Sequence, residues 1–432
     1  MAIAPFSGLR RLCDRRQLAS SRVLGYPRLL DRTHGNQMNA TLLTVFILGQ
    51  ANAEPRFVLH TTDERLVPGI VEQMDASGVV IVGIPAVAVA EVVALRRLDI
   101  ATPPWPRDAH LLLANGDRIV GKPLGIEGSF LIFRADGNRT ASERLRFPLT
   151  TCSILWLRSP DTVERQSLLA GERADDQVIF RNGDVLAGVL TAIDPIKSEF
   201  IVETGGMKRS TSVGKIAAIA FSTKLARVRK PTGLYWHLVL SNGTRLTLTT
   251  ATIDKGELRG QTMYKDAVQF ALADVAALDA YQGKAVYLSD LKPTRYDYRS
   301  YQGEKHVWTA DRSLDGRELQ LQSPSGSVHF DKGLATRSEC SLTYALDGKY
   351  RRFECHLGID PRLGKRGSAI VRILVDGKES KINDGKQLTL ASGMLPIRVD
   401  VSNARELKLM VEWGDGGIVG DYVNWCDARL IP

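Results

Sequence analysis

The last third of the sequence combines aromatic rings with charged and amide side chains that could hold a small polar ligand. The candidates are Trp308, Arg337, Asp421, Tyr422, Asn424 and Trp425. An aromatic ring packs on the apolar C–H face of a sugar, and charged or amide groups bind its hydroxyls. Each candidate lies in or beside an expected loop, where a small polar ligand could reach it. For Trp425, a buried position in the core is at least as consistent with the sequence as a ligand-binding role. For Trp308, the sequence does not distinguish between these two roles.

Enzyme chemistry has no comparable signature in this chain. The sequence contains no Gly-x-Ser-x-Gly elbow, no His-Glu-x-x-His pair and no phosphate-binding loop, and its seven histidines are scattered. Carboxylate pairs occur, but their surroundings mark none of them as a general acid and base. We therefore expect a protein without catalytic residues.

The cysteines indicate neither a zinc site nor a dithiol site, because there is no Cys-x-x-Cys and no His pair near any of them. If Asp347-Gly348 forms a two-residue hairpin turn, Cys340 lies opposite Cys355. A hydrogen-bonded pair of this kind has Cα atoms about 5.5 Å apart, which permits a disulfide in an oxidising compartment. Two reduced thiols buried on one face are an equal alternative.

The amino-terminal region has the layout of an export signal. An apolar core at 40–49 is followed by Ala51-Asn52-Ala53, which predicts cleavage near 53/54. Ten residues are too few to span a bilayer, so no transmembrane segment is expected. Residues 1–37 are then an over-extended start or a long n-region, and residues 1–53 lie outside the mature chain. A disordered basic tail before a buried strand is the alternative.

The charge of the chain does not indicate nucleic-acid binding. The net charge is +9, and residues 1–37 contribute +5 of it through seven arginines and two aspartates. The remaining +4 forms no basic stripe with interleaved aromatics, so we expect no nucleic-acid partner.

Four repeats organise residues 54–282, at about 54–100, 107–158, 175–223 and 234–282. Three carry Asn-Gly between apolar runs, the strongest local hairpin signal. With Asn-Gly at the tip, Leu112 should face Ile119, Ile179 should face Leu186 and Val239 should face Leu246, while Leu59 should face Leu66 in the weaker first copy. Asp117 and Asp184 follow two of these turns, but turn chemistry explains them better than calcium or phosphate binding does. Short strands at this spacing predict tandem barrel-like or meander units.

The segment 285–432 is richer in charged and aromatic residues than the repeats, and it contains an ordered series of family motifs. The series includes Phe330-Asp-Lys-Gly-Leu-Ala-Thr336, Leu342-Thr-Tyr-Ala-Leu-Asp-Gly-Lys-Tyr-Arg-Arg-Phe353, Val371-Arg-Ile-Leu-Val-Asp-Gly-Lys378 and Asp421-Tyr-Val-Asn-Trp-Cys-Asp-Ala-Arg-Leu430. This segment resembles the NPCBM/NEW2 domain, a carbohydrate-binding module also met beside family 98 glycoside hydrolases. The resemblance implies a galactose-binding-like jelly-roll β-sandwich. The β-branched runs and Asp-Gly turns agree, so the whole chain is expected to be all-β.

Two departures from the family pattern bear on the site. Relatives usually have His where Arg337 stands, and Asp-His where this chain has Asp421-Tyr422. The resemblance also raises a structural calcium ion, for which Asp311, Asp360, Asp415 and Asp421 could supply oxygen ligands.

The resulting hypothesis is an exported bacterial protein, periplasmic, at the cell surface or secreted, that binds a glycan or glycoconjugate through its last domain. The alternative is an envelope scaffold that contacts other envelope proteins and binds no sugar.

Overall fold

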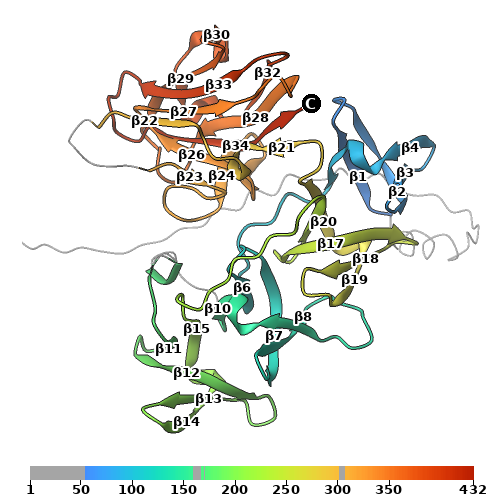
Figure 1. The fold of residues 1–432 in the computed structure, drawn as a ribbon, viewed down its shortest axis with the longest axis vertical. Helices are drawn as coiled ribbons and strands as arrows, with labels where there is room; N and C mark the ends of the chain where they lie inside the picture. Colours follow the sequence, from blue (N-terminus) through green and yellow to red (C-terminus); the bar gives the residue numbers. More distant parts are fainter. Residues whose placement is uncertain (1–53, 159–166, 170, 301–306) are drawn as a thin grey trace, which may run out of the picture. The chain divides into compact units, whose positions relative to one another are not determined.

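The computed structural model describes residues 54–158, 167–169, 171–300 and 307–432 (Figure 1). The expected signal peptide, with its core at 40–49, lies outside the described residues. Residues Glu54–Pro432 form one compact unit, whose described residues lie in strands, tight turns and 3₁₀ segments apart from a short helical stretch at 167–169. The all-β prediction is therefore confirmed. Within the described residues we find no helix with the length and apolar character needed to span a bilayer.

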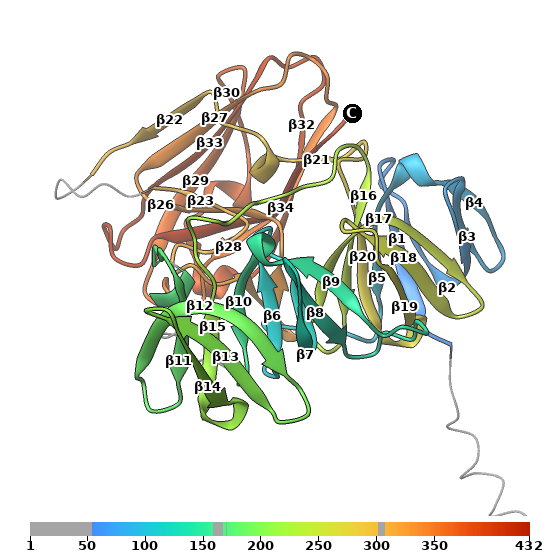
Figure 2. The ribbon, with the colours of Figure 1, turned by 60° about the horizontal axis from the view of Figure 1, so that its bottom comes forward.

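Each repeat contains five strands, with a 3₁₀ turn before the fifth (Figure 2). The first has β1 (Arg56–Thr61), β2 (Leu66–Met74), β3 (Gly78–Ile81), β4 (Ile84–Ala88) and β5 (Val92–Arg97). The second has β6 (His110–Leu113), β7 (Arg118–Glu127), β8 (Phe130–Ala135), β9 (Leu145–Pro148) and β10 (Cys152–Trp156). The third has β11 (Asp176–Phe180), β12 (Val185–Asp194), β13 (Glu199–Thr204), β14 (Met207–Ser212) and β15 (Ile216–Ala220). The fourth has β16 (Tyr235–Leu240), β17 (Arg245–Asp254), β18 (Glu257–Thr262), β19 (Ala267–Ala271) and β20 (Val275–Tyr281).

The last strand of each repeat returns to pair with the first, so each repeat is a barrel-like unit. The second strand bends through a β-bulge, which lets it pair with two neighbours in turn. In β7 the bulge lies between Pro123 and Gly125, and the two halves of the strand pair with β6 and β8. Gly121 precedes the bulge, at the point where the partner of β7 changes from β6 to β8, and an added Cβ there would lie 2.0 Å from the carbonyl oxygen of Arg134.

The hairpins form where Asn-Gly and its equivalent predict them, but the expected register is wrong by one residue in all four repeats. Ile119 faces Leu111 and not Leu112, because only Gly116 of the Asn-Gly pair has positive φ, at 95°. The loop therefore holds three residues, with glycine at the left-handed position. The same one-residue shift in register occurs in the other three repeats and again produces apolar pairs. These are Leu59 with Val67, Val178 with Leu186, and Leu238 with Leu246.

The barrels associate in two symmetric pairs. Strand β5 of the first repeat pairs with β20 of the fourth, with Leu95 opposite Leu278. Strand β10 of the second pairs with β15 of the third, with Leu155 opposite Ile219. All four residues occupy the fourth position of their strands, so each pair joins equivalent surfaces about a local two-fold axis.

The segment after the repeats is a sandwich of two antiparallel sheets (Figure 1). One sheet contains β21 (Val286–Tyr287), β23 (Thr309–Ala310), β26 (Gly333–Arg337), β28 (Arg352–Ile359), β32 (Leu395–Asp400) and β34 (Tyr422–Ile431). The other contains β22 (Arg295–Tyr298), β27 (Cys340–Ala345), β29 (Ser368–Val375), β30 (Lys378–Ser380), β31 (Leu388–Thr389) and β33 (Glu406–Trp413). A separate hairpin consists of β24 (Leu319–Ser323) and β25 (Gly326–Phe330). Buried apolar side chains of both sheets, such as Leu357 and Leu409, share one core.

The hairpin expected at Asp347-Gly348 does not form. Both residues have positive φ, but the turn carries the chain from β27 in one sheet to β28 in the other. Cys340 is therefore opposite Val411 and Cys355 is opposite Ile397, so the two cysteines are not cross-strand partners. Both are buried free thiols.

Candidate functional site

One end of the sandwich carries a pocket of about 460 Å³, which we call the sandwich pocket. It is formed by the end of β26, the β28–β29 loop and the β33–β34 loop with the start of β34. The lining residues are Arg337, Arg362, Leu363, Lys365, Arg366, Ile418, Val419, Gly420 and Tyr422. Arg337 and Tyr422 are thus the predicted sugar-binding residues that the fold brings to this pocket.

Arg337 and Tyr422 are direct cross-strand partners on β26 and β34. The guanidinium carbon of Arg337 lies 5.3 Å from the centre of the Tyr422 ring, in cation–π range. Both side chains are partly exposed. The pair therefore presents an aromatic ring and a fixed cation side by side in the pocket wall.

Asp421 lies directly behind this wall and is buried. Its carboxylate accepts hydrogen bonds from the Ser338 hydroxyl, at 2.8 Å, and from the backbone N–H of Ser368, at 3.1 Å. Burial raises the pKa of Asp421 above its ordinary value, although these hydrogen bonds and Arg337 oppose the shift. The carboxylate joins three segments at the pocket and points away from solvent.

Asn424 and Trp425 are also interior residues. The Asn424 amide donates to the Asp360 carboxylate at 3.0 Å and to the backbone oxygen of Gln320 at 3.1 Å. Trp425 is fully buried in the sandwich core, where its indole N–H donates to the Thr336 hydroxyl at 3.1 Å. This environment agrees with the alternative in which Trp425 fills the core and does not face a ligand.

Trp308 is partly buried against the sandwich core and is not among the described residues that line the pocket. The carboxylates raised for calcium have separate partners: Asp311 accepts from Lys332, and Asp360 accepts from Ser313 and Asn424. Asp415 is exposed. Among the described residues, no three Asp, Glu, His or Cys side chains are grouped so that they could hold a metal ion. Calcium binding stays a prediction.

Glycines bring the two pocket loops into backbone contact. A Cβ at Gly367 would lie 1.9 Å from the carbonyl oxygen of Gly420, and a Cβ at Gly364 would lie 2.7 Å from the same atom. The β28–β29 loop is also held from within, since Asp360 accepts from the backbone N–H of Arg362 at 2.8 Å. The pocket is therefore built from two tightly packed loops.

Sequence reasoning missed Arg362, Lys365 and Arg366, which contribute much of the pocket lining. They lie in the run Arg-Leu-Gly-Lys-Arg-Gly at 362–367, between two strong strand patterns. The sequence signal that could have identified these residues is a basic loop with interspersed glycines between two strands of the sandwich. The position of that loop beside Tyr422 depends on long-range pairing, which local patterns do not reveal.

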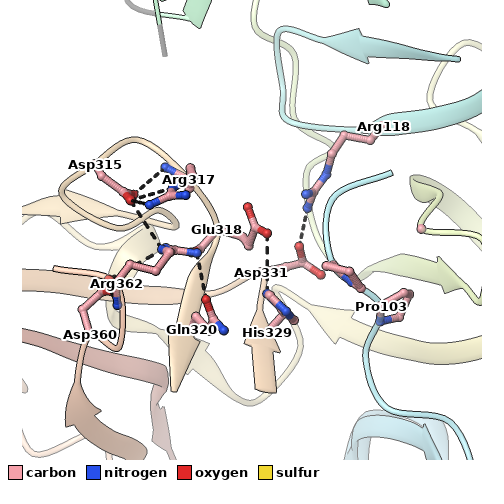
Figure 3. A network of polar contacts seen from close by, with 12 residues as sticks. Pro103, Arg118, Asp315, Arg317, Glu318, Gln320, His329, Asp331, Asp360 and Arg362 are labelled. Carbon is pink, nitrogen blue, oxygen red and sulfur yellow. Dashed lines mark hydrogen bonds and ion pairs between the residues drawn. The ribbon is translucent and has the colours of Figure 1, made fainter. Parts of the chain in front are cut away.

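A second cluster of charges joins the sandwich to the repeats, and we call it the Asp331 cluster. Asp331 follows β25, and its carboxylate lies 2.5 Å from a guanidinium nitrogen of Arg118 (Figure 3). The same carboxylate lies 3.1 Å from Nε of Arg245. The two arginines come from β7 and β17, where they are register partners at equivalent positions after the hairpin turns. One carboxylate of the sandwich thus bridges two arginines that occupy equivalent positions in the second and fourth repeats.

The Asp331 cluster is buried and charged. Burial alone would raise the pKa of Asp331, but Arg245, Arg118 and His237 outweigh it and hold the pKa well below its ordinary value. Burial, followed by the charge of Arg245, lowers the pKa of Arg118 to about 10. Asp331 and Arg118 therefore both stay ionised at neutral pH. A cavity of about 350 Å³ adjoins the cluster, but none of the six predicted sugar-binding residues is among the described residues that line it.

Several solved structures are similar to this chain. One is the second CBM51 module with INT domains of Clostridium perfringens ZmpB in complex with GlcNAc, at 24% identity and a TM-score of 0.31, covering 40% of this chain and 36% of that chain. Another is CBM51 of Clostridium perfringens GH95 in complex with methyl-galactose, at 25% identity and a TM-score of 0.31, covering 34% of this chain and 99% of that chain. The tandem CBM51 modules of Sp3GH98 from Streptococcus pneumoniae SP3-BS71 show 15% identity and a TM-score of 0.32, covering 59% of this chain and 87% of that chain.

This chain thus spans about a third of the ZmpB chain that it matches. A comparison with curated proteins found no match. The family expectation for the last third of the chain is confirmed, because residues 284–431 match the model of the NPCBM/NEW2 domain.

Proposed function

We propose that this chain is an exported, non-catalytic carbohydrate-binding protein that holds a glycan in the sandwich pocket. The supporting observation is the convergence of the Tyr422 ring, Arg337 and the basic β28–β29 loop in one pocket of the NPCBM/NEW2 segment. A ring beside fixed hydrogen-bond donors suits a sugar, which has apolar C–H faces and hydroxyl edges. In this proposal the repeats act as a spacer or as a second interaction surface.

The test is a glycan array probed with the full chain and then with Tyr422→Ala and Tyr422→Phe. We expect binding that Tyr422→Ala removes and that Tyr422→Phe largely retains, because phenylalanine keeps the stacking face. Tyr350→Ala is the matched control. Tyr350 is a partly buried tyrosine near the Asp347-Gly348 turn, at the end of the sandwich opposite the pocket. The backbone N–H of Gly348 in that turn donates to the carbonyl oxygen of Ala404.

Silence across neutral and charged glycans would contradict sugar binding and favour the envelope scaffold. Binding that survives Tyr422→Ala would move the site away from this pocket. Export is tested separately by mass spectrometry of the native protein, where the expected amino terminus is near Glu54. Detection of an intact 1–37 segment on that protein would refute export through the 38–53 signal.

A further inference from the structure

The sandwich pocket carries a strong excess of positive charge. The cations of its lining are Arg337, Arg362, Lys365 and Arg366, and no Asp or Glu is among the described residues that line it. Neutral sugars need hydrogen-bond donors and acceptors in comparable numbers, whereas ionised Lys and Arg side chains are donors only. The lining therefore favours a ligand that presents acceptors and negative charge.

Arg362 has a structural role in this set. Its guanidinium donates to Gln320 Oε1 at 3.0 Å and to the backbone oxygen of Glu318 at 2.6 Å, and it lies 3.4 Å from Asp315 (Figure 3). These contacts tie the β28–β29 loop to the β24–β25 hairpin and its preceding loop. They also neutralise much of the Arg362 charge within the protein.

Lys365 and Arg366 differ from Arg362. Both side chains are exposed on the loop that Gly364 and Gly367 hold against the β33–β34 loop. Among the described residues, no carboxylate forms an ion pair with either of them. Their charges are directed to solvent at the pocket, on a loop whose backbone is fixed.

We infer that the sandwich pocket selects an anionic glycan, one whose sugar carries a carboxylate or a sulfate group. This inference rests on the proposed function and specifies its ligand. Arg366 has the planar fork that pairs with both oxyanions, and Lys365 adds a point charge. The Tyr422 ring, with Ile418 and Val419 beside it in the lining, supplies the apolar surface for the sugar ring.

The experiment is calorimetric titration of the full chain with matched ligand pairs. Trigalacturonic acid and its methyl ester share one stereochemistry and differ in charge, and 3-O-sulfogalactose and galactose form the sulfate pair. We expect the anionic member of at least one pair to bind about tenfold tighter, equivalent to about 1.4 kcal/mol. The preference should shrink as salt rises, because the two cations are exposed. Which pair shows the preference distinguishes a carboxylate from a sulfate.

Variants separate this inference from the proposed function. Lys365→Gln with Arg366→Gln should abolish the preference by weakening binding of the anionic member of the pair far more than binding of the neutral one. Arg366→Lys should retain part of the preference. Equal binding of charged and neutral sugars would overturn the inference while sugar binding stands. No binding of any sugar would overturn both. Equally tight binding of inorganic polyphosphate would also overturn it, because the pocket would then recognise anions without recognising a sugar.

Discussion

Replacement of Asp331 tests whether one carboxylate fixes the sandwich to the repeats. The Arg118 and Arg245 side chains are 8% and 1% exposed, and that of Asp331 is 11% exposed, so the pairs are shielded from water. Asp331→Ala would leave two buried guanidinium groups without their carboxylate. Loss of one partner of a buried ion pair costs about 3 to 5 kcal/mol, and we expect a loss of this size in the free energy of unfolding.

The assay is equilibrium denaturation in guanidinium chloride, followed by tryptophan fluorescence. Glu127→Ala is the control, because Glu127 pairs with Arg144 on the surface, where such a pair contributes about 0 to 1 kcal/mol. Combining Asp331→Leu with Arg118→Met and Arg245→Met should recover part of the loss, since the two buried guanidinium groups are then removed together with their carboxylate. If Asp331→Ala is no more destabilising than Glu127→Ala, the Asp331 cluster does not join the domains.

Three further predictions concern packing and pH. Gly367→Ala should lower both glycan binding and the melting temperature, because the added Cβ would lie 1.9 Å from the carbonyl oxygen of Gly420. Gly214→Ala is the control and should change neither, because its Cβ would meet no atom closer than 3.8 Å. Trp425→Ala should cost about 3 to 5 kcal/mol in denaturant unfolding, and Trp425→Phe clearly less; equal losses would contradict its role as a core plug. Burial raises the pKa of Asp279 to about 6, so the folded state binds this proton more tightly than the unfolded state does. Stability from this group is therefore present at low pH and is lost as pH rises through 6. As the pH falls from 7 to 5, the unfolding free energy of the parent protein should rise by about 1 kcal/mol relative to that of Asp279→Asn. Identical pH profiles for the two proteins would contradict the raised pKa of Asp279.

The sequence was sufficient for features that depend on local chemistry. Asn-Gly turns, apolar alternation and the ordered motifs after residue 285 predicted the all-β class, the hairpins and the NPCBM/NEW2 segment. The hairpin register was missed because Gly116 takes positive φ while Asn115 does not, and this choice between two turn types inserts one residue.

The site depended on contacts distant in sequence. Arg337 and Tyr422 meet because β26 pairs with β34, 85 residues further along the chain. The turn at Asp347 crosses between sheets, and its local sequence is identical to that of a hairpin turn such as Asp376-Gly377, where β29 pairs with β30. Local patterns therefore placed the candidates in loops but could not decide which of them share a pocket.

The pairing of the first barrel with the fourth has a consequence for synthesis of the chain. Strand β5 ends at Arg97, but its partner β20 begins at Val275, so about 180 residues separate them. At ribosomal rates of about 5 to 20 residues per second, β5 emerges about 10 to 35 seconds before β20. Throughout that interval its outer edge is an unpaired template for other strands. We therefore expect a nascent chain arrested before residue 275 to aggregate more readily than the complete chain, because the edge of β5 is then unpaired.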